Sequence, residues 1–555
     1  MIIRPSRLSM EEKEEILKRL WKKDPSLWSD DPNVQKNIIN RLGWLDVLPK
    51  MKDRLEEIIN FAKQIKDEGF TKILLLGMGG SSLCPLIMSK IFGSQQGWPK
   101  LVVLDTTDPD VIESAVTDDE LERCFFIFAS KSGTTIEPNT QFAYFWEKLK
   151  KTVKEPGNHF IAITDPGTPL EILAKEKAFR KCFLNPPDIG GRYSALSYFG
   201  LVPAALLGID LHKLIDRAEN MIKSCGPDVA LDQNPGFILG EFLGEMAAQS
   251  KDKLSFLADP DIEPFGLWLE QLIAESSGKE TLGIVPIVGE SPGIPGFYGG
   301  DRIFVYLRTT GELNDFVKEL KDAEFPIMTF DIKDYYDLGG EFFRWEMATA
   351  LACHFLGVNA FDEPNVKLAK EKTKEIVEIY VKEKKMPITF WVDPQSQINF
   401  RASRMLASSM KSLSRTLRDL FLVLPSWGYL AFLPYLPYDQ EVEEIITDMR
   451  KLVRQEKGCS TTMGFGPRYL HSTGQLHKGG IMSSAFIIFT RRRKKEYPEI
   501  PGYGLSFWHL QFAQAVGDFQ ALSEAKRRVL HIHLPVEFKL GLESFSKVLS
   551  RACRL

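Results

Sequence analysis

The chain has 555 residues, of which 44% are hydrophobic and 26% are charged, a composition typical of ordinary folded proteins. Since a single hydrophobic core stops growing at about 250–300 residues, we expect several domains. The 70 lysines and arginines nearly balance the 74 acidic residues, which leaves a formal net charge of -4. Neither a nucleic acid nor an anionic membrane is therefore expected as a partner.

The 7 cysteines are scattered and form no CxxC pair, which argues against a disulfide framework and against a zinc site. We expect a reducing, cytoplasmic location. The N-terminal residues turn charged before any apolar segment reaches the length of a signal peptide, and Ser9 and Glu12 have the spacing of a helix capping box. The most apolar stretch starts at Phe421, but Pro425 and Pro434 interrupt it, so no membrane segment is predicted.

From Lys72 onward, short apolar runs alternate with amphipathic windows, which predicts βαβ units around parallel sheets. The expected strands of the first unit are KILLLG, KLVVLD, CFFIFA and HFIAIT. Those of the second unit are KLSFLA, LGIVPIV, RIFVYLR and FPIMTFD. After a charged helical stretch, the third unit has the strands WGYLAFLPY, AFIIFT and VLHIHLP, and its basic run RRRKK at 491–495 is expected to be a solvated loop.

The sequence thus predicts an α/β protein with two doubly wound domains, each built on a parallel sheet, and a smaller C-terminal α/β domain. We place a helical segment at residues 1–50, the first domain at 51–230, the second at 231–385 and the third at 386–555.

Two turns rich in glycine and hydroxyl groups follow expected strands of the first unit. Both would lie at the carboxyl ends of parallel strands and would open a helix whose first amides are free. A phosphate monoester suits such turns, although they could equally do no more than cap their helices. Neither has the spacing of a dinucleotide fingerprint or an ATP-binding P-loop, so we expect a sugar phosphate. The candidate phosphate-binding residues are Gly80, Ser81, Ser130, Lys131, Ser132, Thr134 and Thr135.

A third polar turn joins the glycine pair Gly190–Gly191 to a cation, Arg192. The guanidinium could hold an anion that develops during a reaction. A helix cap or a salt bridge at the rim of a site is an equally good interpretation of the spacing.

Four motifs, GMGGSS, SKSGTTIEP, DIGGRYSALSYFG and ESSGK, resemble in order and spacing those of phosphoglucose isomerase (glucose-6-phosphate isomerase), which has two sugar-isomerase (SIS) domains. EFFRWEMATA and GFGPRYLHSTGQLHKGG are similar to the isomerase part of bacterial bifunctional transaldolase/phosphoglucose isomerases. The resemblance covers nearly the whole chain from about Leu20. It implies interconversion of glucose 6-phosphate and fructose 6-phosphate through a cis-enediolate, a step of glycolysis and gluconeogenesis. The transaldolase barrel is not expected, since it needs about 250 residues of its own.

The same resemblance implies roles for single residues. Ser81 and the SKSGTT loop would hold the phosphate, and Arg192 would stabilise the enediolate. PIVGESPG is similar to a GEPG turn of the family, which makes Glu290 the candidate base. NAFDEPNVKLAK places Lys370 where the family has a lysine that contacts the sugar ring, although a solvated face of a lysine-rich helix explains Lys370 equally well.

None of the 8 histidines lies between Glu290 and Glu341, where the resemblance implies a ring-opening histidine. Ring opening needs a group that exchanges protons near neutral pH. The polar turn YLHSTGQLHKGG offers two histidines, so we hypothesise that the third domain folds over the sugar site and supplies His471, with His477 as second choice. The alternative is a polar interdomain clasp without a chemical role.

No metal and no redox cofactor are expected, because a proton moves between adjacent carbons without net oxidation. The expected partner is a small sugar phosphate. Isomerases of this kind are usually homodimers, and association with a separate transaldolase stays open. Two other functions also stay open: an isomerase that accepts mannose 6-phosphate as well, and a sugar-phosphate sensor without catalysis.

Overall fold

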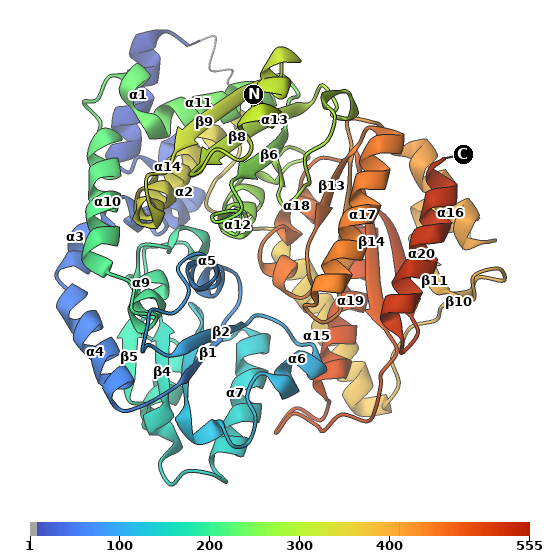
Figure 1. Cartoon of the computed structure of the whole chain (residues 1–555), viewed down its shortest axis with the longest axis horizontal. Helices are drawn as coiled ribbons and strands as arrows, with labels where there is room; N and C mark the ends of the chain where they lie inside the picture. The colour runs from blue at the N-terminus through green and yellow to red at the C-terminus, as the bar shows by residue number, and fades with distance from the viewer. Residues whose placement is uncertain (1–7, 410, 555) are drawn as a thin grey trace.

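The computed structural model describes residues 8–409 and 411–554, and it contains three β-sheets that follow one another along the chain (Figure 1). Helices α1 (Met10–Trp21), α2 (Pro32–Ile39) and α3 (Val47–Lys52) precede the first sheet. The capping box predicted at the first helix is confirmed: the Ser9 side chain accepts from the Glu12 amide, and the Glu12 side chain accepts from the Ser9 amide.

The first sheet has the strand order β2-β1-β3-β4-β5, and all its pairings are parallel. Its strands are β1 (Lys72–Leu76), β2 (Lys100–Leu104), β3 (Cys124–Ala129), β4 (Phe160–Thr164) and β5 (Lys181–Leu184). Its helices are α4 (Leu55–Asp67), α5 (Leu83–Ile91), α6 (Pro109–Ser114), α7 (Ile136–Leu149), α8 (Pro169–Glu176) and α9 (Tyr198–Leu206).

Successive residues of β1 belong to different hydrophobic cores, one on each face of the sheet. Ile73 and Leu75 of β1 pack in one core with α4, α5 and α9, whereas Leu74 and Leu76 pack in another with α6, α7 and α8. Because a strand buried on both faces needs apolar residues throughout, the runs KILLLG and CFFIFA are continuous rather than alternating. This unit is doubly wound, as the sequence predicts.

The second sheet is also parallel, with the order β7-β6-β8-β9. Its strands are β6 (Lys253–Ala258), β7 (Val285–Ile287), β8 (Arg302–Arg308) and β9 (Ile327–Asp331). The helices of this unit are α10 (Leu211–Ser224), α11 (Pro235–Ala248), α12 (Phe265–Ser277), α13 (Asn314–Asp322) and α14 (Leu338–Leu356). Helix α12 packs against α5 of the first unit and against α18 (Gly474–Gly479) of the third, so it contacts all three parts of the fold.

The third sheet is the largest, with the order β10-β11-β15-β14-β12-β13. Its central strands are parallel, while β11 runs antiparallel to both of its neighbours. The strands are β10 (Trp391–Val392), β11 (Asn399–Ala402), β12 (Tyr429–Pro434), β13 (Ser460–Met463), β14 (Ser484–Arg491) and β15 (Arg528–Leu534). The remaining helices are α15 (Val366–Glu383), α16 (Leu413–Val423), α17 (Gln440–Lys457), α19 (Phe507–Glu524) and α20 (Phe538–Cys553).

Each sheet lies within one of the ranges expected for a domain, and the exact boundaries between domains stay predictions. Helix α14 ends at Gly357, whose φ of 72° is left-handed. Helix α15, which follows it, packs along α19 of the third unit. Among the residues the structure describes, no helix combines the length and the hydropathy needed to cross a bilayer.

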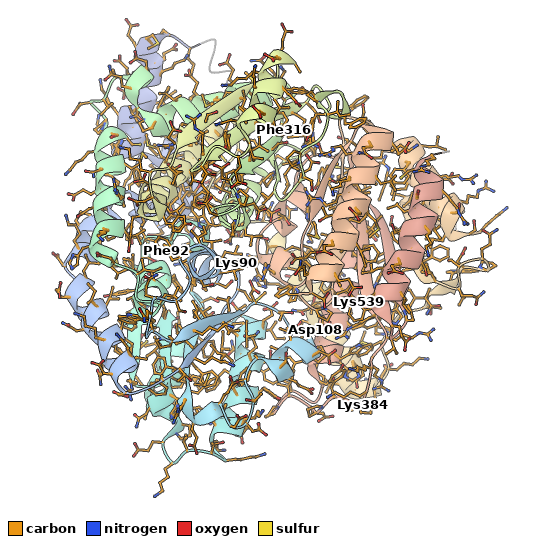
Figure 2. The ribbon with its side chains drawn as sticks, in the orientation of Figure 1. Lys90, Phe92, Asp108, Phe316, Lys384 and Lys539 are labelled. Atoms are coloured by element: carbon orange, nitrogen blue, oxygen red, sulfur yellow. The ribbon has the colours of Figure 1, made fainter. Side chains whose placement is uncertain are left out.

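The basic run at 491–495 differs from expectation at its first residue. Arg491 is only 4% exposed and its guanidinium lies 3.0 Å from Asp108 Oδ2 and 2.7 Å from Asp110 Oδ2. Asp108, labelled in Figure 2 between the first and third units, is fully buried and also caps α6. Burial raises the pKa of Asp108, and the charge of Arg491 opposes this shift. The run therefore begins with a buried ion pair between two units.

Replacing Arg491 by methionine should lower the free energy of unfolding by about 3–5 kcal/mol, because Asp108 would be left as a buried charge without its partner. Urea denaturation followed by circular dichroism measures the change. Arg493, two residues later, pairs with Glu496 at the surface, so Arg493→Met is the matched control and should cost less than about 1 kcal/mol. Equal effects of the two substitutions would contradict the assignment.

Candidate functional site

The two predicted phosphate turns leave the first sheet side by side. Strands β1 and β3 are neighbours, with Leu76 opposite Phe128, although β2 lies between them in the sequence. The chain turns to opposite sides of β1 at this point, and ligands of open α/β sheets bind at such a switch point. The topology thus brings both turns to the position where a ligand is expected.

The second turn, Ser130 to Thr135, folds around its own hydroxyl groups. The Ser130 hydroxyl accepts from the Gly133 amide at 3.1 Å and donates to Thr135 Oγ1 at 3.3 Å. Ser132 Oγ lies 2.9 Å from Thr134 Oγ1, and both side chains are exposed. The hydroxyl groups therefore gather at one end of the sheet.

This turn does not cap its helix in the usual way. Thr135 is the N-cap residue of α7, but its side chain makes no hydrogen bond to the helix. Ser82, at the start of α5, makes none either. Free amides at a helix N-terminus attract anions, because the helix dipole adds to their hydrogen bonds. The structure thus favours the anion-binding interpretation of both turns over simple capping.

Lys131 faces away from the hydroxyl groups, since it forms an ion pair with Asp165 and donates to the Pro187 carbonyl at 3.2 Å. Burial lowers the pKa of Lys131, and Asp165 opposes this shift. Ser81 of the first turn is 8% exposed and lies in the short 3-10 helix η4 (Gly79–Ser81).

Two glycines allow the first turn to approach the rest of the site. A Cβ on Gly80 would lie 2.0 Å from the carbonyl oxygen of Gly191, so only glycine fits there. Gly79 has a φ of 54°, and a Cβ on it would lie 2.7 Å from the carbonyl oxygen of His471. The turn therefore contacts both the third unit and the segment Gly190–Gly191–Arg192, called the GGR segment below.

Arg192 is 4% exposed and is surrounded by acceptors. It donates to Ser276 Oγ at 2.8 Å and to the Ala360 carbonyl at 2.7 Å. Its Nη1 lies 3.3 Å from Glu275 and 3.2 Å from Glu363. Burial alone would lower the pKa of Arg192, but the two carboxylates outweigh it and raise the pKa. Arg192 is thus a fixed positive charge that contacts the carboxylates of Glu275 and Glu363.

Glu275 is a candidate site residue to which the sequence analysis gave no role. It begins the motif ESSGK, whose first three residues form the end of α12, and the resemblance gave this glutamate no role. Gln271, one turn earlier on α12, donates to Glu275 Oε2 at 3.0 Å. Burial raises the pKa of Glu275, and the charge of Arg192 opposes this shift without cancelling it. A cavity of about 170 Å³ is lined by, among others, Lys131, Gly190, Gly191, Arg192, Gln271 and Glu275.

Glu290 is not part of this assembly. Its side chain is 8% exposed and receives two hydrogen bonds from Arg302, at 2.9 and 3.1 Å, with Arg454 of the third unit 3.6 Å away. Burial acts to raise the pKa of Glu290, but Arg302 and the other arginines outweigh it and lower the pKa. A carboxylate held in this way is a weak base, and it lines neither of the two cavities of the site.

The remaining candidates line a second cavity of about 430 Å³ on the other side of the SKSGTT turn. Thr134, Thr135, Lys370 and His471 contribute to its wall. His471 Nε2 lies 3.0 Å from Oε1 of the buried Glu137. Gln271 Nε2, which contacts Glu275, also donates to the His471 carbonyl at 2.9 Å. The third unit thus lines this cavity with His471, and the role of His471 in ring opening stays a prediction.

His477, the second choice, is 2% exposed and packs among aromatic rings, with its Nδ1 3.0 Å from the Tyr429 hydroxyl. Burial lowers the pKa of His477 well below its usual value. Since it lines neither cavity, the structure favours His471.

Parallel sheets with a hydroxyl-rich turn at the switch point are typical of doubly wound α/β proteins that bind a ligand at the carboxyl ends of their strands. Residues 24–285 match the family model described as phosphoglucose isomerase.

Several relatives of the chain are named glucose-6-phosphate isomerase. A probable glucose-6-phosphate isomerase of Methanococcus maripaludis is 27% identical over 383 residues, which span 61% of this chain and 85% of the relative. The glucose-6-phosphate isomerase of Rubrobacter xylanophilus is 26% identical over 428 residues, 66% of this chain and 94% of the relative.

Two solved structures share the fold. A hypothetical protein of Thermus thermophilus aligns with a TM-score of 0.57 at 22% identity, covering 66% of this chain and 95% of its own. A glucose-6-phosphate isomerase of Chlamydia trachomatis aligns with a TM-score of 0.52 at 17% identity, covering 68% of this chain and 86% of its own.

Replacing Ser132 or Thr135 by alanine should weaken the binding of inorganic phosphate about tenfold each, because each change deletes one donor to the same anion. Isothermal titration calorimetry with phosphate measures the effect. The control is Ser114→Ala, which removes an exposed hydroxyl at the end of α6, outside both cavities. An unchanged phosphate affinity in both loop variants would reject the loop as the anion site.

Proposed function

We propose that this protein is an aldose-ketose isomerase that interconverts D-glucose 6-phosphate and D-fructose 6-phosphate. The observation that carries the proposal is the contact between Glu275 and Arg192 in a cavity that the SKSGTT turn also borders. An isomerase of this kind needs an anion site, a base beside it and a fixed positive charge. The SKSGTT turn would be the anion site, Glu275 the base and Arg192 the fixed positive charge.

Glu275 would move the proton between C2 and C1 of the open-chain sugar. As the carboxylate takes the proton from one carbon, the carbonyl oxygen gains negative charge, and Arg192 stabilises it. In the enediolate the hydroxyl proton passes from the oxygen on C2 to the oxygen on C1, and return of the carbon-bound proton to C1 then completes the exchange of carbonyl and hydroxyl without net oxidation. The raised pKa of Glu275 suits this role, because a base is most effective when its pKa lies near the working pH.

His471 would open the sugar ring before this step. A proton must leave the anomeric hydroxyl while the ring oxygen receives one, and a histidine oriented by a carboxylate exchanges protons readily near neutral pH. Lys370 lines the same cavity as an exposed cation, at a suitable place to contact a hydroxyl or oxygen of the sugar.

The cellular setting belongs to the same proposal. All 7 cysteines are free thiols, which supports a reducing, cytoplasmic compartment. Dimerisation and association with a separate transaldolase stay predictions from the resemblance of the sequence.

A coupled assay tests the function directly: purified protein is given fructose 6-phosphate, and formation of glucose 6-phosphate is followed with and without a chelator. We expect turnover that the chelator does not change. Binding of fructose 6-phosphate without turnover would instead support a sugar-phosphate sensor.

Replacing Glu275 by glutamine should lower kcat by about a hundredfold or more, since removal of a general base typically costs about a hundred- to ten-thousandfold. Phosphate binding should be nearly unchanged, because the SKSGTT turn stays intact. Glu290→Gln is the control, and we expect it to retain most of the activity once its stability is matched. If instead Glu290→Gln abolishes turnover and Glu275→Gln does not, the base is Glu290.

A further inference from the structure

Glu137, near the N-terminus of α7, receives two hydrogen bonds on a single oxygen. His471 Nε2 lies 3.0 Å from its Oε1, and Gln514 Nε2 donates to the same atom at 2.7 Å. Glu137 and Gln514 are both 2% exposed. The other oxygen, Oε2, is buried and has no hydrogen-bond partner among the described residues. These two donors are therefore the contacts that fix the rotation of the carboxylate.

The chemistry of the partners settles where each hydrogen lies. Glu137 has a lowered pKa: burial acts to raise it, but the charge and hydrogen bond of His471 outweigh the burial. An ionised carboxylate only accepts, so the amide nitrogen of Gln514 and a protonated Nε2 of His471 must face it. In the neutral imidazole, Nδ1 is then the nitrogen without a hydrogen. That nitrogen is the one able to take a proton from a sugar hydroxyl.

Gln514 is itself held on its other side. Its Oε1 accepts from the hydroxyl of Thr107 at 2.7 Å, and Thr107 is fully buried in the loop after β2. Gln141, one turn after Glu137 on α7, donates to the carbonyl of Leu104 at the end of β2 at 3.2 Å and to that of Thr106 in the same loop at 2.8 Å. The hydrogen bonds thus form a closed ring through α7, the loop after β2 and α19.

We propose that Gln514 is a positioning residue for ring opening: it holds the Glu137 carboxylate in the orientation that keeps the proton on Nε2 of His471 and leaves Nδ1 free. The inference rests on the proposed isomerase function. The third unit would then contribute two residues to ring opening: His471, which precedes α18, and Gln514, which lies on α19.

A purely structural role for Gln514, as a clasp between units, predicts different kinetics. A clasp would affect all substrates and the stability of the fold. A positioning residue for ring opening affects the turnover of cyclic substrates and leaves an open-chain substrate untouched. Erythrose 4-phosphate is a suitable open-chain probe, because its terminal hydroxyl carries the phosphate and cannot close a ring.

The experiment compares Gln514→Leu and Gln514→Glu with Gln511→Leu. Gln511 lies one turn earlier on α19, is 4% exposed, and its Nε2 has no hydrogen-bond partner among the described residues, so it is a matched control. Gln514→Glu keeps the shape of the side chain but turns an acceptor and a negative charge toward Glu137. It therefore tests the proposal even if the leucine variant folds poorly.

For both Gln514 variants we expect kcat on glucose 6-phosphate to fall about ten- to hundredfold, because small displacements of a catalytic group have effects of this size. KM for glucose 6-phosphate and turnover of erythrose 4-phosphate should change less than about twofold, and Gln511→Leu should resemble the wild type. His471→Ala should show the same selective loss.

Equal losses on both substrates, or no loss in the Gln514 variants, would overturn the positioning role while leaving the isomerase function intact. A wild-type protein that fails to convert glucose 6-phosphate would overturn the proposed function and this inference together.

Discussion

The close approach of Gly80 to the Gly191 carbonyl is the contact on which the rest of the site depends. No side chain fits between them, so the backbone of the first phosphate turn lies directly against the GGR segment. That contact places Arg192 beside the second unit, where Glu275 and Ser276 at the end of α12 receive it. An anion site on one sheet is joined in this way to a carboxylate on the next.

The strands were predicted well because each central strand is buried on both faces and therefore reads as a continuous apolar run. KLSFLA and CFFIFA coincide with β6 and β3. The edge strands β2, β7 and β9 were expected, but other strands at or near sheet edges were not: β5 is short and half exposed, and β10, β11 and β13 lack apolar runs. Helix α20 was missed as well, although its apolar residues cover one face of the third sheet.

Part of the candidate site could be proposed from the sequence, and the roles of its residues stay predictions. Ser132, Arg192 and His471 could be named because turns and polar clusters are local in sequence. The choice between Glu275 and Glu290 could not be made in that way, since both are glutamates in short motifs with glycine. What separates them is their partners, Arg192 for Glu275 and Arg302 with Arg454 for Glu290. Arg192 and Arg454 come from segments that are distant in the sequence. Arg491 was misjudged for the same reason, because Asp108 is far away in the sequence.

The ring of hydrogen bonds around Glu137 also has a consequence for the synthesis of the protein. Glu137 and Gln514 are 377 positions apart, and His471 is 334 positions from Glu137. A ribosome adds about 5–20 residues per second, so tens of seconds separate the emergence of α7 from that of α19. During this interval the growing chain lacks Gln514 and, until residue 471 is added, also the proposed ring-opening group. Isomerase activity on ring-form sugars would therefore appear only when synthesis is nearly finished, which makes it a direct reporter of completed chains.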